Sequence, residues 1–395
     1  MTISSIIGWF AFFDLGLTNG LKNELGKSFA NNDFPSAKKD VSSAFYLLAF
    51  ILFILSIIFF GSIFFINWQF FLNTSNITNF EILTLVSILF FSFVLNSLFG
   101  IVFTVLSSNQ NSTIPELYRF LSNFFSILLL FLFKSYYYNS LLFMSIATSI
   151  SSSIVSFLFY FYYFNTSYKK VKPNFKNFSF PRAINLLGKS SLFFIIQISA
   201  LILFMSDNLI ITKLFKPEDV VPYNIAYKLF NIVVVFFSII TTPLWSAITD
   251  ANHKNDFGWI DNTISKMKKL WYLTSIGVIS ILLLSDQIYT FWLGPYININ
   301  FSISFSMCLF VLIHTYNTIY VTFIFAVGKT KLQAILAITA ALLNIPLSIF
   351  FAKYLNIGPA GVILATAICG LPNVFISHLQ YYKIKNKIDT GIWSK

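Results

Sequence analysis

Charged residues are scarce in this sequence. Asp, Glu, Lys and Arg together make 10% of its 395 residues, whereas soluble domains carry about 25%. Hydrophobic residue types make 57% of the chain. So few polar side chains cannot cover the surface of a chain this long. The composition therefore excludes an ordinary water-soluble domain and indicates a protein that lies in a lipid bilayer.

Cysteine and histidine are also rare. The two cysteines, Cys308 and Cys369, sit inside apolar runs, and we interpret them as small packing residues rather than as a disulfide. The three histidines, His253, His314 and His378, have neither zinc-site spacing nor a Cys or carboxylate cluster beside them. The sequence contains no Walker A motif and no Gly-rich nucleotide loop. We therefore predict no metal, no cofactor, no catalytic residue and no ATP hydrolysis by this chain.

Long apolar runs, by contrast, are abundant. A helix needs about 20 apolar residues to cross a hydrocarbon core of about 30 Å, and its backbone bonds to itself because lipid offers no partner. The runs are too long and too continuous for the alternating strands of a barrel. They lie near residues 2–18, 42–66, 81–106, 114–134, 140–164, 188–212, 222–249, 269–286, 301–327, 331–352 and 359–382. We predict an all-α polytopic membrane protein with about eleven transmembrane helices.

The basic residues favour one side of this arrangement. Twenty of the 26 Lys and Arg fall in the connections 19–41, 165–189, 250–269 and 328–331 and in the C-terminal tail. The connections on the opposite side hold Lys134, Lys213, Lys216 and Lys353. Because cytoplasmic connections carry the excess of positive charge, this bias predicts a cytoplasmic C-terminus. It also accounts for the net charge of +12 without nucleic-acid binding.

The longest basic connection divides the chain near its middle. We predict an N-terminal lobe of about five helices at 1–168, a cytoplasmic linker at 169–185, and a C-terminal lobe of about six helices with a basic tail at 186–395. This topology leaves the N-terminus outside, which is unusual, so we expect that a first helix is missing. Restoring it gives twelve helices, six in each lobe. Twofold repetition of this kind is common in transporters, whose substrate site lies between the halves.

Several motifs narrow the interpretation further. They are Phe12-Phe13-Asp14-Leu15-Gly16-Leu17-Thr18-Asn19-Gly20, Asp207-Asn208-Leu209-Ile210-Ile211, Tyr223-Asn224-Ile225-Ala226-Tyr227-Lys228-Leu229-Phe230, Pro243-Leu244-Trp245-Ser246-Ala247-Ile248-Thr249-Asp250, Asn344-Ile345-Pro346-Leu347 and Gly358-Pro359-Ala360-Gly361. In content and order they resemble the polysaccharide-repeat (O-antigen) flippases of the multidrug/oligosaccharidyl-lipid/polysaccharide (MOP) exporter superfamily. The resemblance covers nearly the whole chain and implies a MATE-like bundle of two helical lobes.

The resemblance implies a transport function and no enzymatic one. Such flippases move an undecaprenyl-diphosphate-linked oligosaccharide from the cytoplasmic to the outer leaflet of the bacterial inner membrane by alternating access. The unit then enters lipopolysaccharide O-antigen, capsule or another surface polysaccharide. An ion gradient, of H⁺ or Na⁺, is the expected drive. The expected partners are the lipid-linked substrate, membrane lipids, a polysaccharide polymerase and chain-length proteins, and no nucleic acid.

Three alternatives stay open at this point. The first is a multidrug or peptidoglycan-precursor exporter of the same superfamily, because the motifs do not identify the substrate. A membrane enzyme of polysaccharide assembly is a second alternative. The short connections disfavour it, since such chemistry needs a sizeable segment outside the bilayer. The absent first helix suggests the third alternative, a degenerate and inactive fragment.

Ionisable residues inside membrane spans are costly and are therefore candidates for function. Asp207 lies near the outer end of its predicted helix, with Asn208 beside it, and is a candidate protonatable switch. Lys228 lies at a similar depth in the next predicted helix. We expect Lys228 either to pair with Asp207 or to contact the diphosphate or a sugar, with snorkelling to the outer surface as a further alternative.

Two other charged residues are candidates in the N-terminal lobe. Arg119 offers a planar donor fork suited to phosphate, although Glu116 three residues earlier favours a local ion pair. Asp14 lies near the cytoplasmic end of the first predicted helix. The Gly16-x-x-x-Gly20 spacing beside it favours close helix packing, so a structural role is the stronger interpretation there.

Three prolines fall inside predicted spans, at Pro243, Pro346 and Pro372. Each removes a backbone donor and can kink its helix. Kinked helices suit an alternating-access transporter, although proline is also generally commoner in membrane helices than in soluble ones. We predict these three positions as candidate hinges.

Overall fold

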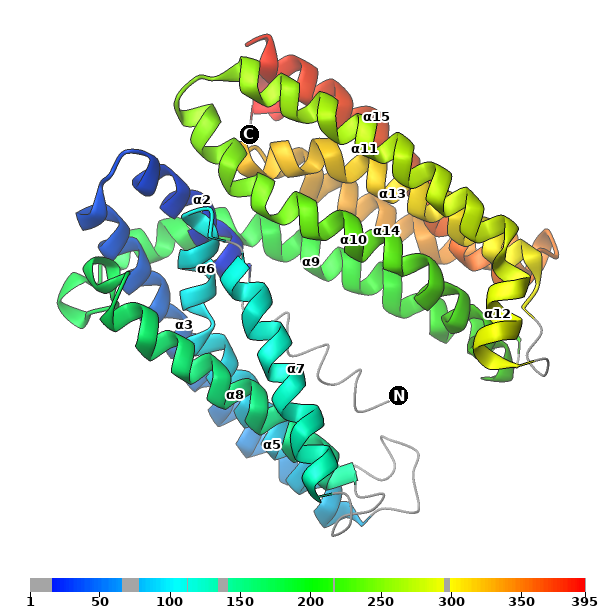
Figure 1. The fold of residues 1–395 in the computed structure, drawn as a ribbon, viewed down its shortest axis with the longest axis horizontal. Helices are drawn as coiled ribbons and strands as arrows, with labels where there is room; N and C mark the ends of the chain where they lie inside the picture. Colours follow the sequence, from blue (N-terminus) through cyan, green and yellow to red (C-terminus); the bar gives the residue numbers. More distant parts are fainter. Residues whose placement is uncertain are drawn as a thin grey trace. The chain divides into compact units, whose positions relative to one another are not determined.

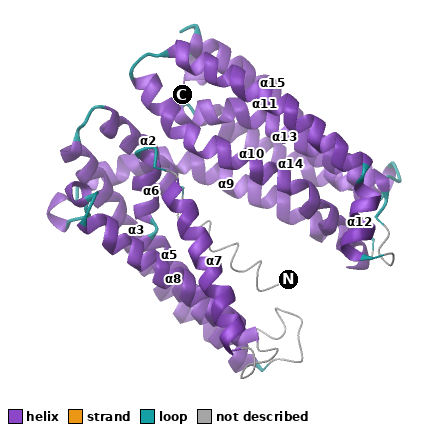
Figure 2. Cartoon of the chain, viewed as in Figure 1, coloured by secondary structure: helices purple, strands orange, loops and turns teal. Residues whose placement is uncertain are grey.

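Long helices make up almost all of the computed structural model, which describes residues 16–65, 78–111, 113–133, 141–215, 217–294 and 299–394 (Figure 2). The helices are α2 (Leu17–Ala30), α3 (Phe34–Ser62), α5 (Asn79–Phe99), α6 (Ile101–Ser108), α7 (Thr113–Phe133), α8 (Leu141–Asn165), α9 (Phe180–Leu214), α10 (Val220–His253), α11 (Phe257–Leu283), α12 (Ser285–Leu293), α13 (Phe301–Val327), α14 (Lys331–Ile349) and α15 (Pro359–Lys385). Short 3₁₀ turns occupy Ile63–Phe65, Lys169–Val171, Phe175–Asn177, Pro217–Asp219 and Gly391–Ser394, and a π-helical turn occupies Phe350–Tyr354.

The predicted spans coincide with these helices. Within the described ranges, nine segments are long and apolar enough to cross a membrane, and a tenth is the pair α11 and α12, bent by 64°. Each predicted run from 42–66 onward falls on one of them, and the run at 269–286 falls on the bent pair. The run at 2–18 lies outside the described residues except for its last three. The prediction of an all-α multi-pass membrane protein is confirmed.

Polar caps set the ends of several spans. At the start of α3 the Asp33 side chain accepts a hydrogen bond from the backbone N–H of Ser36, and at the start of α11 Asp256 accepts one from Trp259. These side chains satisfy backbone donors that the first helical turn leaves free. Gly328 ends α13 with φ of 78°, a left-handed conformation that glycine adopts without strain. The caps lie in connections, where the chain can meet water.

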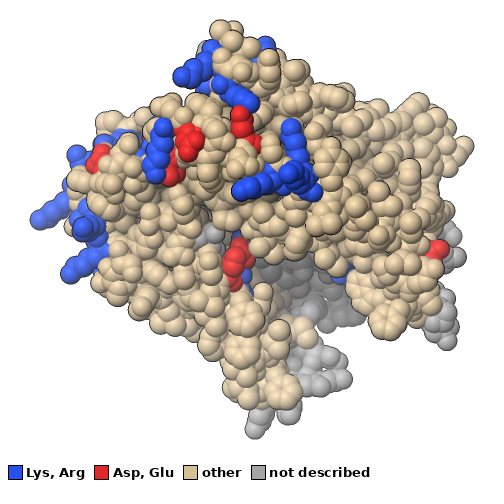
Figure 3. All heavy atoms as spheres, turned by 45° about the horizontal axis from the view of Figure 1, so that its top comes forward, with Lys and Arg blue, Asp and Glu red and all other residues tan. Residues whose placement is uncertain are grey.

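The flanks of the helices carry large apolar side chains that no other part of the described chain covers. Phe50, Phe53, Ile57 and Ile58 of α3 and Phe131 of α7 are examples of exposed hydrophobic residues. On the face shown in Figure 3, Lys and Arg gather in a few patches with Asp and Glu among them, and most of the surface carries neither. A surface of this kind matches hydrocarbon rather than water.

The chain forms two compact units, Met1–Phe194 and Ile195–Lys395 (Figure 1). The division falls inside α9. The segment expected as a linker, at 169–185, therefore lies wholly within the N-terminal unit. Its backbone is bonded to α3, because the N–H groups of Asn174 and Ser179 donate to the hydroxyls of Ser42 and Ser43 at 3.1 Å each.

The N-terminal unit packs α2, α3, α6 and α8 around one apolar core. Leu21 of α2, Val41 of α3 and Phe164 of α8 are among its fully buried residues. The glycine spacing predicted to allow close packing does so: a Cβ atom on Gly20 would lie 2.2 Å from Oγ of Ser190 in α9. A Cβ atom on Gly16 would lie 2.6 Å from the carbonyl oxygen of the same serine.

In the C-terminal unit, α13 is the central helix. It packs against α10, α11 and α15, and side chains such as Ile319, Tyr320 and Phe323 are fully buried there. In Figure 1 these helices run alongside one another, and α14 packs against α15. This unit holds the buried carboxylate and the cavity described below.

Connections predicted to share the cytoplasmic side are brought together within each unit. At one end of the C-terminal unit, Lys385 pairs with Asp261 at 2.6 Å, Lys329 pairs with Asp389, and Gln380 donates to the Lys329 carbonyl at 2.9 Å. These contacts join the start of α11, the α13–α14 connection and the C-terminal tail. The arrangement agrees with the alternation of connections predicted from the basic residues.

Candidate functional site

Asp207 of α9 is a carboxylate buried inside the C-terminal unit. It is 2% exposed, and its Oδ2 atom accepts a hydrogen bond of 2.6 Å from the hydroxyl of Tyr223, which is 3% exposed. Its Oδ1 atom is buried and has no hydrogen-bond partner. One hydroxyl compensates a full negative charge poorly in a membrane span, because an unpaired buried charge is costly.

A second polar contact lies one residue further along both helices. The Asn224 side chain of α10 donates to Oδ1 of Asn208 at 3.1 Å. Both contacts join residues sixteen positions apart. The two hydrogen bonds show that the end of α9 contacts the start of α10. A functional role of Asn208 stays a prediction.

Lys228 does not pair with Asp207 in the structure. Its side chain is exposed, and no ion pair found among the described residues includes it. Tyr223, and not Lys228, is the partner of the Asp207 carboxylate. The reason is helical geometry: Lys228 comes five residues after Tyr223, which moves it about 7 Å along the helix and by about 140° around it. Lys228 therefore differs from Tyr223 both in its position along α10 and in the helix face that it occupies.

Arg119 forms the local ion pair that its neighbour favours. Its guanidinium lies 3.0 Å from Glu116 on the same helix, and the two side chains are 70% and 45% exposed. A role of Arg119 toward phosphate stays a prediction. Asp14 lies outside the described residues.

The three candidate hinge prolines, Pro243, Pro346 and Pro372, lie inside α10, α14 and α15 respectively. Each of these helices continues through its proline. A π-helical turn, Phe350–Tyr354, follows Pro346 directly after the end of α14. The hinge role of the prolines stays a prediction.

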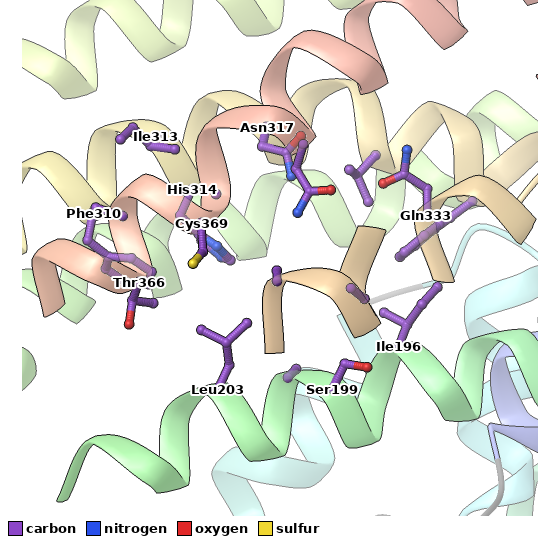
Figure 4. Close-up of a pocket in the computed structure, with 18 residues that line it drawn as sticks. Ile196, Ser199, Leu203, Phe310, Ile313, His314, Asn317, Gln333, Thr366 and Cys369 are labelled. Atoms are coloured by element: carbon purple, nitrogen blue, oxygen red, sulfur yellow. The ribbon is translucent and has the colours of Figure 1, made fainter. Parts of the chain in front are cut away.

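A cavity of about 200 Å³ lies inside the C-terminal unit between α9, α13, α14 and α15 (Figure 4). Its walls are mainly apolar, with Leu203 and Phe310 among them. Its polar lining residues are Ser199, His314, Asn317, Gln333, Thr366 and Asn373. Within the described chain, no Asp, Glu, Lys or Arg lines the cavity, so its interior is electrically neutral apart from the imidazole.

The polar groups of the cavity differ in how they are satisfied. Gln333 donates to Ser377 and to Gln380 at 3.1 Å each. In contrast, the side-chain oxygens of Asn317 and Asn373 are buried without a hydrogen-bond partner. Buried polar groups without a partner are uncommon in proteins, so these two oxygens are candidate acceptors for a polar ligand or a water.

Sequence reasoning missed this cavity. The sequence patterns predict no role for Asn317 or Asn373, and they exclude His314 only as a zinc ligand. The available signal was the presence of amide side chains inside strongly apolar spans, where such groups are expensive. The sequence did not reveal which helix faces meet, so those amides could not be assigned to one place.

Sequence reasoning also missed a polar network in the N-terminal unit. Oδ1 of Asn96 in α5 accepts hydrogen bonds from Tyr118 of α7 at 3.2 Å and from Ser152 and Ser156 of α8 at 3.1 and 2.9 Å. One amide thus joins three helices. Because its hydrogen bonds are made within the unit, we interpret the network as structural.

A hydrophilic pocket lies where α2, α3 and the start of α9 meet in the N-terminal unit. Glu24 pairs with Lys27 at 2.8 Å and with Lys189 at 3.0 Å, and Arg182 pairs with Asp40 at 2.8 Å. Burial raises the pKa of Glu24, but the hydrogen bonds and charges of Lys27 and Lys189 outweigh it and leave that pKa below its ordinary value. These ion pairs hold α9 against α2 and α3.

Comparison with known proteins supports the resemblance drawn from the motifs. No family model matches the chain. It is 24% identical over 348 residues to a Yersinia pseudotuberculosis protein named as a candidate O-antigen export protein, covering 83% of this chain and 75% of that protein. It is 26% identical over 108 residues to a candidate O-antigen transporter of Salmonella typhimurium, covering 27% of this chain and 25% of that one.

Among solved structures, the chain is similar to an outward-facing multidrug resistance transporter of the MATE family, within the MOP superfamily. The TM-score is 0.78 at 15% identity, and the match covers 96% of this chain and 85% of that transporter. Identity this low shows the fold alone. The predicted MATE-like fold is confirmed, and so is the similarity in sequence to the O-antigen exporters.

Proposed function

We propose that this multi-pass membrane protein with the MATE fold is a MOP-superfamily flippase. It moves a lipid-diphosphate-linked oligosaccharide from the cytoplasmic to the outer leaflet of the bacterial inner membrane, for export of O-antigen or another surface polysaccharide. The observation that carries the proposal is the similarity to an O-antigen exporter along 83% of the chain, on a fold shared with transporters.

The composition of the transmembrane part supports the same proposal. A flippase has to carry sugars and a diphosphate through hydrocarbon, which needs polar groups placed inside spans at a cost in free energy. Asp207, Asn317 and Asn373 are such groups, and each has a buried side-chain oxygen without a partner. A helix that served only for anchoring would have no need of them.

Asp207 is our candidate for coupling transport to an ion gradient. A proton neutralises its carboxylate directly, whereas a metal cation prefers several oxygen ligands around it. Apart from the Tyr223 hydroxyl, no hydrogen-bond partner of this carboxylate is found in the described structure. We therefore propose H⁺ rather than Na⁺ as the coupling ion, and Asp207 as the group that binds and releases it during alternating access.

The orientation proposed for the chain follows from its charges. The contacts that join Lys329 to Asp389 and Lys385 to Asp261 place the C-terminal tail at the basic end of its unit. Because basic connections remain in the cytoplasm, we propose that the C-terminus is cytoplasmic. The proposed partners are a polysaccharide polymerase and chain-length proteins, which would act on the oligosaccharide after it reaches the outer leaflet.

Complementation tests the function. The chain is expressed in a strain deleted for its own polysaccharide-repeat flippase, and in a second strain that supplies the glycan pathway native to this chain. Restored surface glycan in either strain supports the proposal. Membrane insertion without glycan in both strains, together with resistance to drugs in an efflux-deficient strain, would replace it with the multidrug alternative.

Two variants test the coupling residue in the same assay. Asp207→Asn keeps the shape and removes the titratable group, so export should fall at least about tenfold, the loss expected when a required proton carrier is removed. Asp286→Asn is the matched control, because it removes an exposed carboxylate from α12 and should leave export unchanged. Normal export by Asp207→Asn would exclude Asp207 from coupling.

A further inference from the structure

The size of the cavity in the C-terminal unit restricts the ligands that fit it. Its volume of about 200 Å³ exceeds the volume that one molecule occupies in liquid water, about 30 Å³. It lies below the volume of sites for drug-sized ligands, roughly 300–1,000 Å³. The space fits one small ring or a few waters. A long oligosaccharide or an isoprenoid tail does not fit inside it as a whole.

The lining favours a ligand without charge. A diphosphate needs cationic partners, and within the described part of the chain no Lys or Arg lines the cavity. An organic cation in so apolar a space needs an anionic partner to offset its lost hydration, and among the described residues no Asp or Glu lines the cavity. The ligand that fits is therefore neutral.

The unsatisfied oxygens favour a ligand with hydrogen-bond donors. Oδ1 of Asn317 on α13 and Oδ1 of Asn373 on α15 are both buried without partners. Both residues line the cavity, and Asn317 is labelled in Figure 4. An apolar occupant would leave these acceptors unpaired, at a cost of about 1–3 kcal/mol for each. Ligand hydroxyl groups would satisfy them once rotation of each amide brings its oxygen to the cavity surface.

One wall of the cavity is aromatic. The rings of Phe310 and His314 stack with centroids 5.4 Å apart and an angle of 26° between planes, and both residues line the space. A sugar ring has hydroxyls at its edge and C–H groups on its faces. An aromatic wall combined with amide groups matches both kinds of surface, whereas a cluster of waters would use only the amides.

We infer that this cavity receives one uncharged sugar ring of the transported oligosaccharide, with Asn317 and Asn373 accepting hydrogen bonds from its hydroxyls and the Phe310–His314 pair lying against its face. The inference rests on the proposed function, which it extends by assigning the sugar part of the substrate to one place in the C-terminal unit. The charged diphosphate is recognised elsewhere.

The chain contains its own reporter for this cavity. Cys369 lines it and is 8% exposed, whereas Cys308 is 3% exposed and belongs to the neighbouring apolar core. Replacing Cys308 with Ala leaves Cys369 as the single cysteine. Its rate of modification by the small reagent methyl methanethiosulfonate, followed by intact mass on the full chain in nanodiscs, then measures access to the cavity. Ser199→Cys on α9 supplies a second reporter position if Cys369 reacts too slowly to follow.

Methyl glycosides of glucose, galactose, rhamnose and N-acetylglucosamine are the probes, and cyclohexanol is the ring of similar size without the hydroxyl array. At least one glycoside should slow the modification, by about threefold when present at twice its Kd, and cyclohexanol should not. Asn317→Leu and Asn373→Leu should each abolish this protection while the ligand-free rate stays measurable. Asn386→Leu, which removes an exposed amide near the C-terminus, is the matched control and should retain it.

Two results would overturn the inference. One is no protection by any glycoside up to about 100 mM, a hundred times a Kd of 1 mM. The other is equal protection by cyclohexanol, which would make the cavity an apolar site. The complementation assay separates this from the function itself: restored export without protection rejects only the sugar site, whereas protection without export in any strain rejects the flippase and leaves a saccharide site.

Discussion

The hydroxyl of Tyr223 in α10 donates a hydrogen bond of 2.6 Å to the carboxylate of Asp207 in α9, and both side chains are buried. The contact places the acidic candidate of the C-terminal unit beside a neutral donor. A lysine partner would fix the negative charge permanently, whereas a tyrosine permits both the charged and the neutral carboxyl. This difference matters for a group proposed to carry a proton.

Removing the Tyr223 hydroxyl should destabilise the protein through Asp207. In Tyr223→Phe the carboxyl loses its donor, which should lower the free energy of unfolding by about 1–3 kcal/mol. The double variant Tyr223→Phe with Asp207→Leu leaves no buried polar group there, so it should recover much of the loss. Unfolding in mixed micelles measures the four proteins of this cycle. Additive single effects would show that the two side chains do not interact.

Stability in acid should depend on Glu24. The folded-state pKa of this carboxyl is lowered, so its contribution is fully present above the ordinary glutamate pKa of about 4.3. That contribution is lost as pH falls through the lower folded-state value. Glu24→Gln should therefore reduce stability at neutral pH and make the loss of stability below about pH 4 shallower. Melting temperatures across this range measure the effect, with the exposed Glu218→Gln as control; identical acid profiles would contradict it.

Asn96 should contribute to the stability of the N-terminal unit, because one side chain joins three helices. Asn96→Leu removes the acceptor shared by Tyr118, Ser152 and Ser156, which should cost about 1–3 kcal/mol of unfolding free energy. Asn109→Leu, at an exposed position with one bond to Tyr168, is the matched control and should change stability by less than about 0.5 kcal/mol. Equal stability of the two variants would show that the network contributes nothing.

The contact of Gly20 with Ser190 predicts a rescue. Gly20→Ala places a methyl group 2.2 Å from Oγ of Ser190, and overpacking of this kind typically costs about 1–3 kcal/mol. The hydroxyl is the nearest atom, and the next atoms lie at 3.3 Å. Ser190→Ala should therefore restore most of the stability lost in Gly20→Ala and change little alone, because that hydroxyl is buried without a partner. Failure of the rescue would point to a backbone clash.

The sequence was sufficient to predict the features that depend on one helix at a time. The spans followed from apolar length, and Gly16 and Gly20 predicted close packing because no other residue lets backbones approach so nearly. The placement of Asp207 inside a membrane-spanning helix followed from its position within an apolar run. These signals are local, so the other helices were not needed to find them.

Features that depend on the meeting of two helix faces were not predictable from the sequence. Tyr223 contacts Asp207, whereas Lys228 lies five residues further along α10 and faces another direction, and the sequence did not show which of the two would meet the carboxylate. The amides Asn317 and Asn373 come from helices far apart in the sequence. Their convergence depends on how α13 and α15 are rotated against each other, and periodicity in lipid is weak because both faces of such helices are apolar.

The attachment of the segment before α9 has a mechanical consequence. Asn174, Ser179 and Arg182 are bonded to α3, so the chain passes from one unit to the other inside a helix of 35 residues. Such a helix is about 52 Å long, and a sharp bend opens backbone hydrogen bonds that lipid cannot replace. The stiffness of α9 near Phe194, rather than the slack of a loop, therefore limits how far the covalent connection lets the two units turn.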